Sequence, residues 1–131
     1  MIIKDKRIDD LIYKIRGCVF NVYNALGPYY VEKFYEHALM IEFSDIGIEA
    51  KRQIEIPTYY KDRRLDLTLK ADIIVNNEIL LELKANSHPE PNKYYRQTLS
   101  YMRLTQMKYG MIINFGVDNL IKDNGIIPLA L

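Results

Sequence analysis

An aspartate, a glutamate and a lysine interrupt two apolar runs in residues 70–85, which read KADIIVNNEILLELKA. Charged groups among Ile, Val and Leu are costly to bury unless they are paired, solvated or bound to a metal. Glu82 and Lys84 are two residues apart, so on a β-strand both side chains emerge from the same face. Together with Asp72 they form either the solvated edge of a sheet or a site.

The turn between the two runs decides whether Asp72 lies on the same face as Glu82. A two-residue turn at 76–77 would place Asp72 opposite Leu81, on the wrong face. A three-residue tip at 76–78 places Asp72 directly opposite Glu82, and asparagine in a left-handed conformation suits such a tip. A bulge near Asp72 would also restore the match.

Two opposed carboxylates on neighbouring strands predict a cation site. Their Cβ atoms would lie within about 5 Å of each other. Like charges so close repel and raise one pKa unless a divalent cation lies between them. Carboxylate oxygens without His or Cys suit Mg²⁺ or Mn²⁺, with waters completing the coordination. Lys84 would then orient or activate the attacking water, or stabilise charge on a phosphoryl group.

The pattern therefore indicates metal-assisted hydrolysis of a phosphodiester bond. The alternative is a solvated strand face, because an Asp followed at some distance by Glu-x-Lys also occurs by chance. The apolar runs at 73–75 and 79–81 argue against a merely solvated edge.

The hydrophobic periodicity predicts the elements that position these residues. In chain order we expect helices over residues 8–26 and about 31–45, strands over 51–60, 63–75 and 79–85, a helix over 92–107 and a strand over 109–116. The tail, residues 117–131, is ambiguous between a turn and a final edge strand. A helix between the third and fourth strands makes a crossover, so these two strands should be parallel, with a right-handed connection. The order ααβββαβ predicts one α/β domain over residues 1–131 with a mixed central sheet flanked by helices.

Composition limits the class of protein. A length of 131 residues with 49% hydrophobic and 27% charged residues fits one folded domain. The formal net charge of +1 gives no overall attraction to nucleic acid, so any such contact needs a local basic patch. The single cysteine, Cys18, excludes an intramolecular disulfide and a cysteine-based metal site. No basic leader and no apolar run of membrane-spanning length is evident, which predicts a cytoplasmic protein without membrane contact.

The stretch KADIIV…LLELKA resembles the core of the PD-(D/E)xK nucleases, in which an acid on one strand and E-x-K on the next bind metal. The predicted element order is also similar to that restriction-endonuclease-like core. Almost the whole chain is similar to the small bacterial GxxExxY family of this superfamily. The matching stretches are GCVFNVYNALGP, VEKFYEHAL, ADIIV, LLELKA, QTLSYM and YGMIINFG. In the name motif Glu32 and Tyr35 are in place, but Tyr29 stands at the glycine position.

The resemblance implies roles for individual residues. Asp72 and Glu82 would be metal ligands, with help from the backbone carbonyl of Leu83, and Lys84 would be the catalytic lysine. Glu32 resembles the helix-borne acid that joins the metal shell in many such nucleases.

Gln97 and Tyr101 match the Q-x-x-x-Y arrangement of RecB-like members. Four residues apart on a helix, they share one face and can both point at the site. A phosphate track is a further expectation, contributed by Arg63, Arg64, Lys93 and Arg96. The alternative for all six residues is an ordinary polar surface.

We therefore predict a nuclease that depends on Mg²⁺ or Mn²⁺ and acts on DNA, with a homodimer left open. The rival from another class is a nuclease-like fold that binds nucleic acid or a partner protein without cutting. A third reading is a purely structural oligomer.

Overall fold

The computed structural model describes residues 5–131. The elements are α1 (Lys6–Leu26), α2 (Glu32–Asp45), β1 (Ala50–Tyr60), β2 (Arg63–Val75), β3 (Ile79–Lys84), α3 (Pro91–Thr105), β4 (Tyr109–Asn114) and β5 (Ile126–Ala130). The strands form one sheet in the order β1-β2-β3-β4-β5. Only the pair β3–β4 is parallel, as the crossover through α3 requires. The expected α/β class and mixed sheet are confirmed, and the ambiguous tail contains an edge strand, β5.

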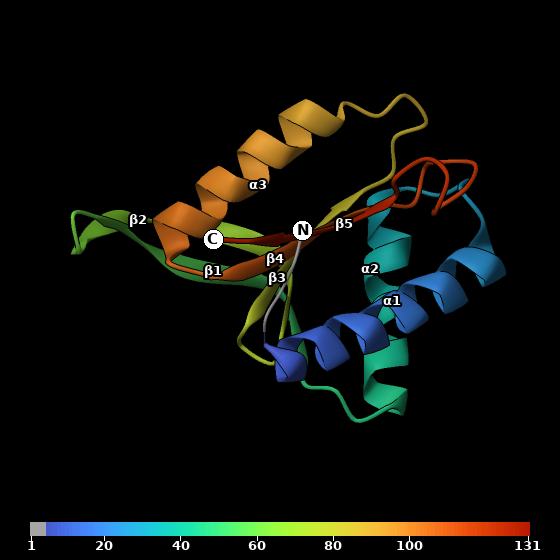
Figure 1. Cartoon of the computed structure of the whole chain (residues 1–131), viewed down its shortest axis with the longest axis horizontal. Coiled ribbons are helices and arrows are strands. Elements are labelled where there is room, and N and C mark those ends of the chain that lie inside the picture. Colours follow the sequence, from blue (N-terminus) through green and yellow to red (C-terminus); the bar gives the residue numbers. More distant parts are fainter. Residues whose placement is uncertain (1–4) are drawn as a thin grey trace.

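The sheet separates two layers of helix (Figure 1). Alternate strand residues such as Ile73, Leu81 and Leu83 pack with α1 and α2 in the main core. The opposite face, represented by Leu80 and Ile112, lies on the side of α3 in smaller clusters. Because side chains alternate along a strand, Glu82 and Lys84 share the α3 side with Leu80.

The β1–β2 hairpin extends well beyond the rest of the sheet (Figure 1). β3 pairs only with the last three residues of β2, Ile73–Val75, so the remainder of the hairpin forms a two-stranded arm. Its turn, at Lys61 and Asp62, has positive φ values of 48° and 63°, which are typical of a tight hairpin turn. Gln106, just after α3, donates to Asp62 at 3.4 Å, so the arm reaches the C-terminal end of α3.

The ends of β3 and β4 approach each other closely. The Phe115 N–H donates to the Lys84 carbonyl at 2.8 Å. A Cβ atom on Gly116 would lie only 2.4 Å from the backbone nitrogen of Asn86, so this crossing accommodates glycine alone. The backbone that carries Lys84 is thus fixed from the β4 side.

No helix within residues 5–131 combines the length and the apolar character needed to cross a membrane.

Candidate metal and phosphodiester site

The β2–β3 turn has the three-residue form that brings the two strand acids together. Its two asparagines have positive φ values of 52° and 55°. Ile73 pairs with Leu81 across the hairpin, so continuing this register places Asp72 opposite Glu82. The parity of the strands therefore puts both acids on the α3 side of the sheet.

The backbone pairing of β2 with β3 ends at Ile73 and Leu81. Beyond this pair the Asp72 side chain, rather than the β2 backbone, bonds to β3. Consecutive residues of a strand direct their N–H and C=O groups to opposite neighbours. Because the Lys84 carbonyl faces β4, the backbone groups of Leu83 face β2. The Leu83 N–H donates to Asp72 Oδ2 at 2.8 Å, and the Leu83 carbonyl faces the same gap. The Asp72 carboxylate and the Leu83 carbonyl oxygen thus lie at the gap where β2 and β3 separate.

Glu82 is a buried carboxylate beside other acids. Only 7% of its surface is exposed, and burial, followed by the charge of Asp72, raises its pKa to about 7. Lys84 opposes this shift, and Glu32 adds to it. The pKa of Asp72 is also raised, mainly by burial, although the bond from the Leu83 N–H lowers it. Two carboxylates that resist ionisation together are stabilised by a cation between them.

Glu32 lies in the first turn of α2 and lines a cleft together with Lys84. Its side chain is exposed, but partial desolvation and the charge of Asp72 still raise its pKa. Within residues 5–131, no three His, Cys, Asp or Glu side chains already surround one point that could hold a metal ion. The oxygen donors that could hold a metal are Asp72, Glu82 and the Leu83 carbonyl, with Glu32 as a further acid near them. Such a small oxygen set suits Mg²⁺, which keeps several of its waters.

Lys84 is held by residues of α3. Its Nζ donates to Gln97 Oε1 at 3.3 Å, and Gln97 Nε2 donates to the Tyr101 hydroxyl at 2.9 Å. The same Nζ lies 5.0 Å from the centroid of the Tyr94 ring, a distance that permits a cation–π interaction. Gln97 and Tyr101 thus form one chain of contacts that ends at the strand lysine.

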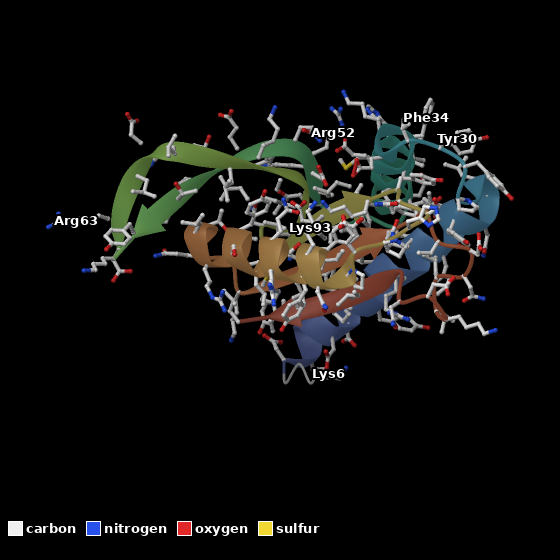
Figure 2. All side chains as sticks on the ribbon, turned by 90° about the horizontal axis from the view of Figure 1, so that it is seen from above. Lys6, Tyr30, Phe34, Arg52, Arg63 and Lys93 are labelled. Carbon is white, nitrogen blue, oxygen red and sulfur yellow. The ribbon has the colours of Figure 1, made fainter. Side chains whose placement is uncertain are left out.

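A cleft of about 410 Å³ opens above these residues, between the start of α2 and the start of α3. It is lined by Glu32, Lys84, Ala85, Asn86, Glu90, Lys93, Tyr94 and Gln97. Lys93 lies on the outer side of α3 and pairs with Glu90 at 3.6 Å (Figure 2). A larger hollow lies on the arm, but its lining, residues 64–68, contains a single acid and no paired carboxylates.

The four basic residues expected to contact phosphate do not form one cluster. Lys93 borders the cleft and Arg96 is exposed one turn further along α3. Arg63 and Arg64 instead follow the turn of the arm, well away from Lys93 (Figure 2). The length of α3 separates the two pairs by roughly 20 Å.

Glu36 is a buried acid near Asp72 that the sequence patterns did not single out. Glu36 is one turn after Glu32 on α2 and is only 3% exposed. Arg52 Nε donates to Glu36 Oε2 at 3.1 Å, and Gln53 Nε2 donates to Glu36 Oε1. The spacing of four residues between Glu32 and Glu36 was a usable signal, because it puts both acids on one helix face. Gln53 gave no such signal.

Comparison with known proteins gives one match. The family model of the PD-(D/E)XK nuclease superfamily matches residues 9–125, a range that includes Asp72, Glu82 and Lys84. No match was found among curated proteins or among solved structures. The family match covers most of the sequence and agrees with the observed α/β fold. The chain therefore belongs to the PD-(D/E)XK nuclease superfamily.

Proposed function

We propose that the protein is a nuclease of the small GxxExxY type that hydrolyses phosphodiester bonds of DNA with the help of Mg²⁺ or Mn²⁺. The observation that carries the proposal is Glu82, which is only 7% exposed, lies beside Asp72 and accepts no hydrogen bond from the described residues, while its carboxylate keeps some contact with solvent. Burial without such partners is unfavourable for a carboxylate that serves only the fold. Membership of a nuclease superfamily supports the same conclusion.

The side chains divide the work by their chemistry. Asp72 and Glu82, with the Leu83 carbonyl, would hold the metal, and Glu32 would complete the acidic wall of the cleft. A bound divalent ion would neutralise phosphate charge and make water a better nucleophile. The Lys84 ammonium, held by Gln97, would stabilise the negative charge that develops on the phosphoryl oxygens. Tyr101 would keep Gln97 in place through its hydroxyl.

The basic residues supply contacts to the nucleic-acid backbone. Lys93 at the cleft and Arg96 beyond it would bind phosphates near the reacting one. Arg63 and Arg64 would touch a strand only if it extends along α3 to the tip of the arm. Phosphate contacts carry no sequence information, so this surface fits a nuclease without strong sequence preference.

The decisive experiment is a cleavage assay with Mg²⁺ and with Mn²⁺ on single- and double-stranded DNA and on RNA. We expect DNA cleavage that stops with chelator and falls by about a thousandfold in Lys84→Ala. Lys14→Ala, which removes a lysine exposed on α1, is the matched control and should cut normally. DNA binding without cleavage under either metal, unchanged by Lys84→Ala, would establish instead a catalytically silent binding domain. Cleavage of RNA alone would keep the enzyme and correct the substrate.

A further inference from the structure

Gln53 has an unusual backbone conformation in the middle of β1. Its φ value is +52°, in the left-handed region that residues other than glycine rarely adopt within strands. Its neighbours Arg52 and Ile54 pair with Ile73 and Ala71, so Gln53 lies opposite Asp72. Such a conformation costs about 1–3 kcal/mol and persists only where the surroundings compensate.

The Gln53 side chain connects two acids. Its Nε2 donates to Glu36 Oε1, and the side chain belongs to the residue opposite Asp72 on the neighbouring strand, where its amide counteracts the rise in the pKa of the Asp72 carboxyl. A primary amide carries two N–H groups, so one nitrogen can serve both carboxylates. Glu36 is itself fixed, because it is buried and bound by Arg52 at 3.1 Å. The amide is thus held by a fixed acid on α2, in a residue that lies opposite Asp72 on the neighbouring strand.

We propose that Gln53 is a positioning residue for Asp72: Glu36 orients the Gln53 amide, and the amide fixes the carboxylate that caps the Leu83 N–H. The left-handed backbone turns the side chain toward these acids. The consequence for metal binding rests on the proposed function, whereas the orientation of Asp72 does not. Partners that orient a metal ligand in this way typically contribute 10–100-fold in affinity.

Gln53→Gly separates positioning from folding. Glycine adopts a positive φ without steric cost, so the substitution removes the amide and relieves the backbone at once. If the side chain served only the fold, its removal would lower the midpoint of thermal unfolding and leave the site unchanged. If it positions Asp72, the site should lose its order by more than any change in the midpoint accounts for, because glycine relieves the backbone while Glu36 loses one of its two donors.

Two readouts follow the site itself. The first is amide hydrogen exchange of Leu83, whose N–H is bonded to Asp72 at 2.8 Å. We expect this amide to exchange about tenfold faster in Gln53→Gly, because its acceptor is no longer held. The amide of Phe115, bonded to the Lys84 carbonyl, should not change. The second readout is calorimetric titration with Mn²⁺, in which we expect affinity to fall about tenfold or more.

Gln106 provides a matched control. It is also a glutamine with a left-handed backbone, φ 59°, but it lies after α3 and contacts Asp62 on the arm. Gln106→Gly should therefore change neither the Leu83 exchange rate nor Mn²⁺ affinity. Gln53→Asn keeps a residue that tolerates positive φ and shortens the amide by one methylene. It should behave like the glycine variant, because it cannot reach both acids.

The outcomes distinguish this inference from the nuclease proposal. Leu83 exchange that is unchanged in Gln53→Gly, or that rises no more than Phe115 exchange does, overturns the positioning role. Faster Leu83 exchange in a protein that neither binds Mn²⁺ nor cuts DNA supports the positioning role and rejects the nuclease. Faster exchange together with weaker Mn²⁺ binding supports both.

Discussion

Glu36 on α2 and Glu82 on β3 are both buried glutamates, with 3% and 7% of their surface exposed, but their surroundings differ. Glu36 accepts hydrogen bonds from Arg52 and Gln53. Glu82 has acids for neighbours, and within residues 5–131 it accepts no hydrogen bond.

The difference separates a carboxylate that supports the fold from one that awaits a ligand. Among residues 5–131 the only fully buried side-chain polar atom without a partner is the Thr98 hydroxyl, so the Glu82 carboxylate, which has no protein donor, keeps some contact with solvent. A raised pKa beside a specific charged neighbour, as at Glu82, is typical of functional positions. We therefore expect the hydrogen bonds of Glu36 to stabilise the native state, and Glu82 to be available for a cation.

The largest expected effect is on cleavage. Glu82→Gln keeps the shape of the side chain and removes its charge, so single-turnover cleavage with Mn²⁺ should fall by about a thousandfold or more. Glu36→Gln should cost about tenfold, because it acts on Asp72 only through Gln53. Equal losses in the two variants would contradict the division of roles.

A rise in pH should change the stability of the metal-free protein and its affinity for Mn²⁺ in opposite directions. The pKa of Glu82 is raised from 4.5 to about 7, so between these values the folded state binds more protons than the unfolded state. The free energy of unfolding without metal should therefore fall as pH rises from 4.5 to 7, by at most about 3 kcal/mol. Mn²⁺ affinity should rise over the same range, because the ion displaces the proton. Urea titrations with chelator and calorimetry at pH 5, 6, 7 and 8 measure the two trends.

The same pH series has an internal control. In Glu82→Gln the fall in metal-free stability should largely disappear, leaving the smaller contributions of Asp72 and Glu32, whose pKa values are also raised. At pH 8 this variant should be more stable than the unmodified protein. A stability that increases steadily with pH would show that Glu82 is ionised in the folded protein well below neutral pH.

A smaller effect is expected on stability when Glu36 is removed. Glu36→Ala leaves Arg52 and Gln53 without their acceptor, which should lower the free energy of unfolding by about 2 kcal/mol in urea. The value is below that of a fully buried ion pair because Arg52 is 36% exposed. Glu42→Ala, on the same helix, removes an exposed hydrogen bond to Asn21 and should cost well under 1 kcal/mol. If both variants lose the same amount, Glu36 has no special structural role.

The smallest expected effect concerns the hydroxyl that holds Gln97. Tyr101→Phe removes one neutral hydrogen bond at 2.9 Å and keeps the ring, so cleavage should slow by only a few fold. Gln97→Ala, which loses the direct contact with Lys84, should slow it more. Michaelis–Menten measurements at one metal concentration rank the two variants. The reverse order would place Tyr101 in direct contact with the substrate.

Local sequence patterns predicted most of the helices and strands of this molecule. The period-two and three-and-four spacings located every helix and strand up to β4, with small differences at the ends, such as α3 over Pro91–Thr105 rather than 92–107. The requirement that Asp72 face Glu82 pointed to the three-residue tip, and the structure has that tip. Such features depend on residues close in sequence, where alternation alone fixes the face.

Contacts between distant segments were beyond the reach of those patterns. Nothing in the sequence around Gln53 indicates a left-handed backbone, and its partners, Glu36 on α2 and the strand residues of β2, are distant in sequence. Arg63 and Arg64 were grouped with Lys93 by charge, yet they follow the turn of the arm near the C-terminal end of α3, whereas Lys93 lies at its start. Spacing reveals which residues share a face of one element, but it does not reveal how far an element extends from the others.

Gly116 has no side chain that could take part in a reaction, but its close contact with Asn86 can affect the position of Lys84. A methyl group there would push on Asn86, two residues after Lys84, so the disturbance would reach the ammonium through the backbone. A genetic screen for inactive mutants that still accumulate as folded protein should therefore recover Gly116→Ala alongside changes in the acids themselves. For anyone who diversifies this scaffold by directed evolution, Gly116 belongs with the residues to be kept constant.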